Sequence, residues 1–259
     1  ATRNSDLFVD EEEVTNLRTK LQGELPHRHF GDAVRLEVAE NCSESMTEFL
    51  LAQFGLGAAD LYRVEGPVNL VRLMQVPDWV DHPDLKFSAF TPGVPKAVGK
   101  GINIFDSIRR SDILLHHPYQ SFAPVIEFLN QAALDPQVVA IKMTVYRTGT
   151  DSVLMQSLIR AAQNGKEVTV VVELMARFDE EANIGWATKL EEVGAHVVYG
   201  VVGYKTHAKA LLIVRREEGG LKRYAHLGRI EEATGRHAAG TAQTDGADDG
   251  QGRPGFELQ

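Results

Sequence analysis

A histidine and a lysine two positions apart, His207 and Lys209, are the residues best suited to carry chemistry. In a strand, this spacing would put both side chains on one face, with an ammonium beside an imidazole. A nearby cation disfavours the imidazolium, so a ring nitrogen stays free to attack phosphorus, and the cation can stabilise phosphoryl oxygens. The same short pattern is also typical of a surface histidine in a basic strand. The hypothesis therefore depends on the neighbouring residues.

Positive charge gathers around this pair although the chain as a whole is acidic. The 259 residues include 27 Lys and Arg against 36 Asp and Glu, a net charge of −9. Between Lys205 and Arg229, seven Lys or Arg residues stand against two Glu. This local excess of five positive charges favours a negatively charged substrate, whereas the acidic whole argues against a general nucleic-acid coat. We therefore expect no nucleic acid but a phosphate-rich partner, with Lys205 among the residues that bind its phosphate.

Two arginines, Arg147 and Arg177, each come just after a predicted buried strand. Guanidinium groups mounted in this way can clamp the oxygens of a phosphate chain and offset charge during phosphoryl transfer. Ordinary pairing with the acidic residues Asp179, Glu180 or Glu181 is the alternative.

One further histidine is a candidate for the same region, and two others are considered as metal ligands. His226 ends the last predicted strand and could reach the crevice as a donor to phosphate or a proton carrier, with a structural role equally open. His116 and His117 have no Cys or His partner at zinc-like spacing, so we expect no zinc. The sequence has neither the Gly-x-x-x-x-Gly-Lys-Ser/Thr loop nor the protein-kinase signatures.

Alternating strands and helices must position these residues. We predict strands at 112–115, 138–146, 167–173 and 195–199, with helices beginning at Ser121 and spanning 152–163 and 179–193. This alternation favours a largely parallel sheet with helices on its faces, and ligands of such sheets bind beyond the carboxyl ends of the strands. Strands at 207–214 and 221–225, joined by 215–220, are predicted to form a hairpin.

The remaining segments are expected to support or flank this region. Residues 1–92 look like a supporting domain with a strand at 33–38 and a helix capped at Ser45, and the proline- and glycine-rich stretch 77–101 marks a boundary. The tail 229–259 has six glycines and few large apolar residues, so we expect it to be disordered.

Composition indicates the compartment. The single cysteine, Cys42, cannot form an internal disulfide, and no apolar run approaches the ~20 residues of a membrane span. A cytoplasmic protein without a transmembrane segment is expected. Because the chain begins without Met or a signal peptide, we interpret it as an internal fragment.

Several segments, taken in order, resemble the bacterial polyphosphate kinase family, the histidine-phosphorylated type whose catalytic domains share the phospholipase D fold. They are Thr2–Leu7, Asp112–Phe122, Ala140–Arg147, Val172–Asn183, Lys205–Ala210 and Arg223–Gly228. The resemblance covers about residues 1–228. It implies an α/β fold with a mostly parallel or mixed phospholipase D-like sheet flanked by helices, preceded by a partial α+β head domain. The implied domains are 1–92, 93–228 and the divergent tail 229–259.

The resemblance also implies a reaction. Members of this family transfer the terminal phosphate of ATP reversibly to inorganic polyphosphate through a phosphohistidine, with Mg²⁺. His207 matches the phosphorylated nucleophile, Arg147 and Arg177 match the pair at the magnesium and phosphate site, and His226 matches a second active-site histidine. Full-length members are expected to be homo-oligomers.

The sequence departs from the family after Gly228, and we interpret it as the end of the head domain plus the first catalytic domain, without the second phospholipase D-like domain or the N-terminal helical domain. We therefore expect weak or no activity from this fragment alone. Two rival functions stay open. A phospholipase D-type phosphodiesterase would carry Asp five residues after Lys209, where this chain has Val214. The other rival is a non-catalytic polyphosphate-binding module.

Overall fold

The computed structural model describes residues 1–4, 17–25, 31–200, 204–231 and 236–244. The chain forms two compact units, Ala1–Phe90 and Thr91–Gln259, which divide within the proline- and glycine-rich stretch. In the described ranges, no helix has both the length and the apolar character needed to cross a lipid bilayer.

The first unit is built on a three-stranded sheet in the order β1-β2-β3. Its main elements are β1 (Thr2–Arg3), α1 (Leu17–Glu24), β2 (Ala33–Ala39), α2 (Glu44–Phe54), β3 (Leu61–Val64) and the short α3 (Val76–Trp79). β1 runs antiparallel to β2, whereas β3 runs parallel to it after the crossover through α2. Leu36 and Val38 of β2 are buried and lie two residues apart, on one face of the strand.

The helix α2 is capped earlier than the sequence predicted. Ser43, and not Ser45, is the N-cap, and its hydroxyl accepts a hydrogen bond from the Met46 N–H. Both serines have the right chemistry, so only the backbone conformation could decide between them.

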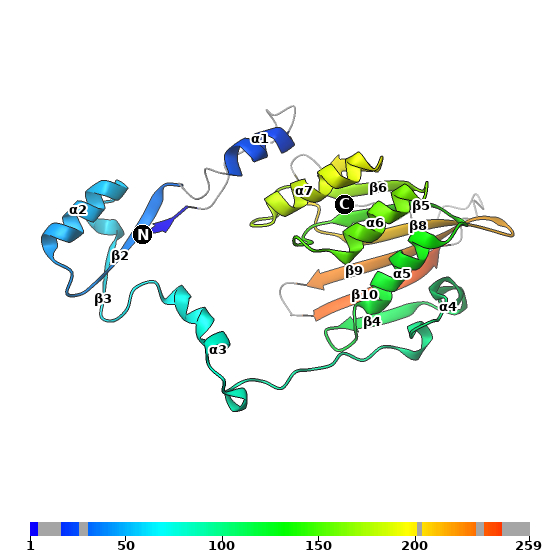
Figure 1. Cartoon of the computed structure of the whole chain (residues 1–259), viewed down its shortest axis with the longest axis horizontal. Coiled ribbons are helices and arrows are strands. Elements are labelled where there is room, and N and C mark those ends of the chain that lie inside the picture. The colour runs from blue at the N-terminus through cyan, green and yellow to red at the C-terminus, as the bar shows by residue number, and fades with distance from the viewer. Residues whose placement is uncertain (5–16, 26–30, 201–203, 232–235, 245–259) are drawn as a thin grey trace. The chain divides into compact units, whose positions relative to one another are not determined.

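The second unit is a seven-stranded sheet in the order β4-β10-β9-β8-β5-β6-β7. The strands are β4 (Ile113–His117), β5 (Val138–Val145), β6 (Glu167–Val172), β7 (His196–Tyr199), β8 (Lys209–Glu217), β9 (Gly220–Glu231) and β10 (Arg236–Thr244). The helices are α4 (Ile104–Arg110), α5 (Ala123–Leu134), α6 (Val153–Gln163) and α7 (Glu180–Glu192). Figure 1 shows α5, α6 and α7 side by side over one face of this sheet.

The core lies between these helices and the sheet. Every second residue of β6 is an almost fully buried valine, Val168, Val170 and Val172, while α6 buries Met155 and Leu158 completely. The strand period of two and the helical spacing of three therefore direct both apolar faces into one layer. This arrangement gives the carboxyl ends of the strands a rigid base.

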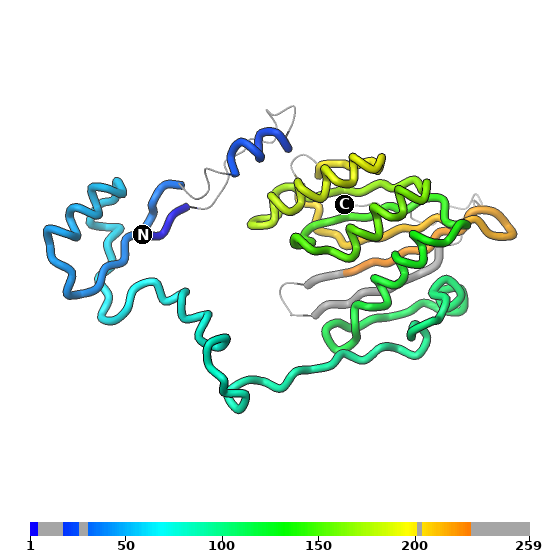
Figure 2. Tube along the Cα trace, in the orientation of Figure 1, coloured from blue at the N-terminus to red at the C-terminus, as the bar shows by residue number. Residues whose placement is uncertain are grey.

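The predicted α/β fold with a mixed sheet is confirmed, although its parallel part is restricted to three strands. β5, β6 and β7 are parallel, and Figure 2 shows the backbone crossing between them through α6 and α7. The other neighbouring pairs in the sheet are antiparallel. The local sequence predicted the strands themselves. It did not predict that β8 pairs with β5, because this pairing joins residues far apart in the chain.

The predicted hairpin is present with altered bounds. β8 and β9 pair from Lys209↔Gly228 to Glu217↔Gly220, so the turn between the strands consists of Glu218 and Gly219 alone. The sequence placed the first strand from His207 onward, which is wrong, because β8 begins at Lys209.

The tail differs from the expected disorder where it is described. The backbone of β10 (Arg236–Thr244) lies between β9 and β4 and pairs antiparallel with both. Residues 245–259 lie outside the described residues.

The pairing directions bring several strand ends to one edge of the sheet. β4, β5, β6, β7 and β9 run in one direction, and β8 and β10 run in the other. The carboxyl ends of the first group therefore meet the start of β8. Ligands of such sheets bind beyond these ends, so this edge is where a site is expected.

Candidate phosphate-transfer site

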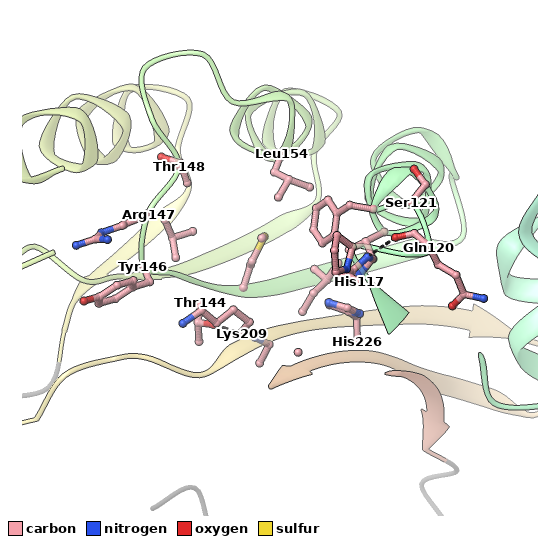
Figure 3. Close-up of a pocket in the computed structure, with 18 of the residues that line it drawn as sticks. His117, Gln120, Ser121, Thr144, Tyr146, Arg147, Thr148, Leu154, Lys209 and His226 are labelled. Carbon is pink, nitrogen blue, oxygen red and sulfur yellow. Dashed lines mark hydrogen bonds between the residues drawn. The ribbon is translucent and has the colours of Figure 1, made fainter. Parts of the chain in front are cut away.

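A cavity of about 640 Å³ opens at this edge of the sheet. Its lining includes Arg147 after β5, Lys209 at the start of β8, His226 of β9 and His117 at the end of β4. Figure 3 shows Arg147 and Lys209 toward one end of the cavity and His117 and His226 toward the other. Apolar side chains such as Leu154 contribute to the wall between them.

Arg147 is held at the cavity by two contacts. Its Nε lies 3.1 Å from an Asp179 carboxylate oxygen, and its Nη2 donates to the Arg177 carbonyl oxygen at 3.0 Å. The pairing with Asp179 that the sequence left open is therefore present. A guanidinium carries five N–H donors, so these two contacts leave capacity for a ligand. The Arg147 side chain is half-exposed, which keeps it accessible.

The turn that carries Arg147 is fastened by helix α7. Asn183 Nδ2 donates to the Tyr146 carbonyl oxygen at 2.8 Å, and Trp186 Nε1 donates to the Gly149 carbonyl oxygen at 2.8 Å. Asn183 is fully buried. These bonds satisfy backbone groups that a strand end would otherwise leave without partners.

Arg177 does not line this cavity. Its side chain is exposed, and its guanidinium carbon lies 5.9 Å from the centre of the Phe178 ring. The two arginines are joined through the Arg177 carbonyl rather than by converging guanidinium groups. The sequence predicted that Arg147 and Arg177 would clamp phosphate together. Of these two arginines, Arg147 lines the cavity and Arg177 does not.

His207 lies in the segment before β8, so it does not share a strand face with Lys209 as predicted. Its ring meets the Tyr146 ring edge to face, with ring centres 4.6 Å apart. Lys209 Nζ lies 4.8 Å from the same Tyr146 ring centre and donates to the His207 carbonyl oxygen. His207 is not among the residues that line the cavity, but Tyr146 and Lys209 are. Lys205, also predicted to bind phosphate, is exposed two residues before His207.

His226 is a buried residue of the cavity wall. It is 5% exposed and pairs in register with Leu211 of β8. Gly228 makes room beside it, because a Cβ at that position would lie 3.1 Å from Lys209 Cβ and 3.7 Å from His226 Nε2. The tight approach of the two strands at this point therefore favours glycine.

His117 is a cavity residue that sequence reasoning considered only as a metal ligand. Its Nδ1 lies 2.7 Å from the Gln120 carbonyl oxygen, so Nδ1 carries the hydrogen and donates (Figure 3). Its Nε2 is buried and has no hydrogen-bond partner among the described residues. The Phe122 ring lies near both histidines, with its centre 5.5 Å from that of the His117 ring and 6.5 Å from that of the His226 ring. The adjacent His-His-Pro sequence was the signal that could have found it.

The magnesium expected at Arg147 and Arg177 does not fit these residues as ligands. A guanidinium has no acceptor atom and repels a cation, whereas Mg²⁺ takes oxygen ligands. The carboxylate of Asp179, which lies beside Arg147, is paired with it. Within the described ranges, no group of three or more His, Cys, Asp or Glu side chains could hold a metal ion.

The fold and the cavity together define a class of protein: an α/β domain that presents cationic and imidazole groups at the edge of its sheet, suited to handling phosphate. Residues 103–245 match the sequence model of the polyphosphate kinase C-terminal domain 1, and residues 1–76 match that of the polyphosphate kinase middle domain. The chain belongs to the polyphosphate kinase family. The family resemblance predicted from the sequence is confirmed.

Individual relatives agree with this assignment. The chain is 65% identical over 231 residues to a polyphosphate kinase of Burkholderia multivorans, covering 88% of this chain and 34% of that protein. It is 62% identical over 242 residues to the polyphosphate kinase of Neisseria meningitidis serogroup A, covering 93% and 35%. The crystal structure of polyphosphate kinase from Porphyromonas gingivalis matches with a TM-score of 0.66 and 25% identity, covering 81% of this chain and 33% of that one. The chain therefore spans about a third of the length of the curated relatives that it matches.

Proposed function

We propose that this chain carries the phosphate-accepting centre of a polyphosphate kinase, which transfers the terminal phosphate of ATP reversibly to inorganic polyphosphate. The observation that carries the proposal is the meeting of Arg147, Lys209 and His226 in one cavity, with His207 in contact with Tyr146 of its wall. These are cationic and nucleophilic groups on a rigid sheet edge, in a chain that belongs to this family.

In the first step, a ring nitrogen of His207 attacks the terminal phosphorus of ATP. The new P–N bond forms while the bond from this phosphorus to the bridging oxygen breaks, and ADP leaves with the bonding electron pair. Lys209 and Arg147 are close enough to the Tyr146 ring, at 4.8 and 5.4 Å from its centre, to place positive charge beside His207. Such charges stabilise the oxygens of a transferring phosphoryl group.

In the second step, a terminal oxygen of polyphosphate attacks the phosphohistidine. The P–N bond breaks, the chain grows by one phosphate, and the imidazole of His207 is restored. His226 is proposed to donate to phosphate or to carry a proton in this exchange, because its ring lines the cavity. Mg²⁺ would neutralise charge on ATP without a ligand from Arg147 or Arg177, and Arg177 is proposed to contact phosphate outside the cavity.

The location and the rate of the reaction can also be proposed. Because the kinase consumes ATP, it is proposed to act in the cytoplasm. Phosphoryl transfer depends on positioning and charge neutralisation, so a chain with a third of the relatives' length is proposed to label His207 slowly.

The direct test is incubation of the chain with ATP labelled at the terminal phosphate, followed by mass spectrometry of the peptide that contains His207. We expect acid-labile phosphate on His207, and none in the variant His207→Ala. A label that persists in His207→Ala, or no label on the wild-type chain, contradicts the proposal. Hydrolysis of a phosphodiester without ATP would support the phosphodiesterase, and salt-sensitive binding of polyphosphate without label would support a binding module.

A further inference from the structure

Glu173 is a buried carboxylate at the end of β6 that none of the steps above uses. It is 4% exposed. Its Oε1 accepts a hydrogen bond from the Met175 N–H at 2.9 Å, and its Oε2 accepts one from the Thr206 N–H at 2.6 Å. Because Thr206 lies 33 residues further along the chain, this one carboxylate joins the turn after β6 to the segment before β8.

The backbone of Glu173 is itself fixed on two sides. Its N–H donates to the Val145 carbonyl oxygen at 2.9 Å, and its carbonyl oxygen accepts from Asn183 Nδ2 at 2.9 Å. The carboxylate is therefore mounted on a frame made by β5 and α7. A side chain held in this way can fix the segment that it binds at a defined position relative to the sheet.

The segment that receives this contact includes His207. Thr206 precedes His207 directly, and the pairing of β8 with β9 begins only at Lys209. On the other side of His207, Thr144 Oγ1 donates to the Ala208 carbonyl oxygen and accepts from the Ala210 N–H at 2.9 Å. His207 is thus placed between an anchor from the end of β6 and an anchor from β5.

We propose that Glu173 is a positioning residue for the nucleophile, which fixes His207 at the sheet edge through the Thr206 N–H. The structural part of this inference stands on the contacts alone, and its consequence for phosphate transfer rests on the proposed function. A carboxylate is required at this position because both of its oxygens face backbone donors. An amide would keep one acceptor and set its NH₂ group against an N–H.

The first experiment measures the segment without using activity. Amide hydrogen exchange at Thr206 and the imidazole proton shifts of His207 are recorded by NMR for the wild-type chain and for Glu173→Gln. Loss of a hydrogen bond to a charged acceptor predicts that Thr206 exchanges roughly ten- to a hundredfold faster. The His207 protons should lose the ring-current shift caused by Tyr146, because the two rings are in edge-to-face contact.

Glu167→Gln provides the matched control. Glu167 begins the same strand at its opposite end and is exposed, so the same change in charge and shape should leave Thr206 and His207 unchanged. Unchanged exchange and unchanged His207 shifts in folded Glu173→Gln would overturn the proposal. If Glu173→Gln does not fold, Glu173→Asp keeps the charge but shortens the side chain. Thr206 should then exchange faster than in the wild-type chain, and equal exchange rates would overturn the proposal.

The second experiment measures the transfer of label from ATP to His207. A displaced nucleophile should slow labelling at saturating ATP by roughly a hundredfold, while the ATP concentration for half-maximal rate changes by less than about twofold. Labelling at the wild-type rate in Glu173→Gln, despite faster Thr206 exchange, would overturn the catalytic part. If the wild-type chain takes up no label, the proposed function fails, and the exchange data still decide whether Glu173 holds the segment.

Discussion

The imidazole of His207 meets the ring of Tyr146 edge to face, with ring centres 4.6 Å apart and planes at 88°. Tyr146 lines the cavity, and Lys209 Nζ lies 4.8 Å from the centre of the same ring. One aromatic ring is therefore in contact with both the proposed nucleophile and the neighbouring ammonium. The His207 side chain is therefore held beside the cavity by its contact with the Tyr146 ring, and not by a place in strand β8, which begins at Lys209.

The ring of Tyr146 should therefore matter more than its hydroxyl. Tyr146→Phe keeps the ring and should label His207 from ATP within about twofold of the wild-type rate. Tyr146→Leu removes the edge-to-face contact, which is worth about 0.5–1.5 kcal/mol, and should lower the labelling rate roughly two- to tenfold. Mass spectrometry of the His207 peptide over time gives both rates. Equal rates in the Phe and Leu variants would refute this role of the ring.

The two nitrogens of His117 should have separable roles. Nδ1 donates to the Gln120 carbonyl oxygen, whereas Nε2 is buried in the cavity wall without a partner among the described residues. An Asn side chain can replace the donor at Nδ1, and a Gln side chain can reach the position of Nε2. We expect His117→Asn to unfold at a temperature close to that of the wild-type chain, and His117→Gln to be less stable by about 1 kcal/mol.

Ligand binding should leave this order unchanged. Nε2 is buried, so a phosphate compound in the cavity should not reach it. Saturating ATP or polyphosphate should therefore raise the melting temperature of His117→Asn and His117→Gln by the same amount, which thermal unfolding with and without each ligand measures. A smaller rise in His117→Asn than in His117→Gln would show that Nε2 contacts the ligand.

Arg147 should bind phosphate through the planar shape of its guanidinium as well as its charge. Arg147→Lys keeps the charge but loses the forked donor set that also reaches Asp179 and the Arg177 carbonyl. We expect both Arg147→Lys and Arg147→Ala to bind polyphosphate more weakly, by roughly three- to thirtyfold, with the larger loss in the Ala variant. Titration calorimetry at two salt concentrations gives the affinities.

Arg216→Ala is the control for this loss of charge. Arg216 is an exposed residue of β8 near the opposite end of the strand from Lys209. Its removal lowers the net charge by the same amount away from the cavity. If Arg216→Ala weakens binding as much as Arg147→Ala, the effect belongs to the overall charge and not to the site.

Much of the fold could be predicted from the sequence because its signals are local. The alternating valines of β6 and the spacing of Met155 and Leu158 on α6 each specify one buried face. The antiparallel placement of β8 beside β5 could not be predicted in this way, because it depends on contacts between residues far apart in the chain.

The candidate site shows the same limit. Arg147 follows the end of β5 and Lys209 begins β8, as strand ends predicted, and both line the cavity. His226 also lines the cavity, but the prediction that it ends its strand is wrong, because β9 continues to Glu231. The period-two pattern through His207 and Lys209 suggested a continuous strand, but the Glu173 carboxylate binds Thr206 and the strand begins later. The catalytic roles of His207, His226 and Lys209 and the phosphate-binding roles of Arg147, Arg177 and Lys205 stay predictions.

A charged cluster at the other end of the hairpin should make stability depend on pH. Glu217 accepts hydrogen bonds from Tyr224 and Arg215, and Arg109 of α4 lies 3.5 Å from its other oxygen. Desolvation alone would raise the pKa of Glu217, but these hydrogen bonds and the two arginine charges together lower the pKa below its ordinary value of 4.5. The same cluster raises the pKa of Tyr224, chiefly through burial and then through the bond to Glu217.

The sign of the effect follows from the direction of the Glu217 shift. Well above pH 4.5 the carboxylate is charged in both states and its stabilisation is fully present. As the pH falls through 4.5 toward the lower pKa of the folded state, the unfolded chain binds the proton first and this stabilisation is lost. Glu217→Gln should therefore lower the free energy of unfolding at pH 7 by about 1.5–3 kcal/mol and by much less at about pH 3. Urea unfolding at both pH values tests this, with Glu218→Gln in the exposed turn as the control. A difference between wild type and Glu217→Gln that stays constant from pH 7 to pH 3 would show that the cluster does not couple protonation to folding.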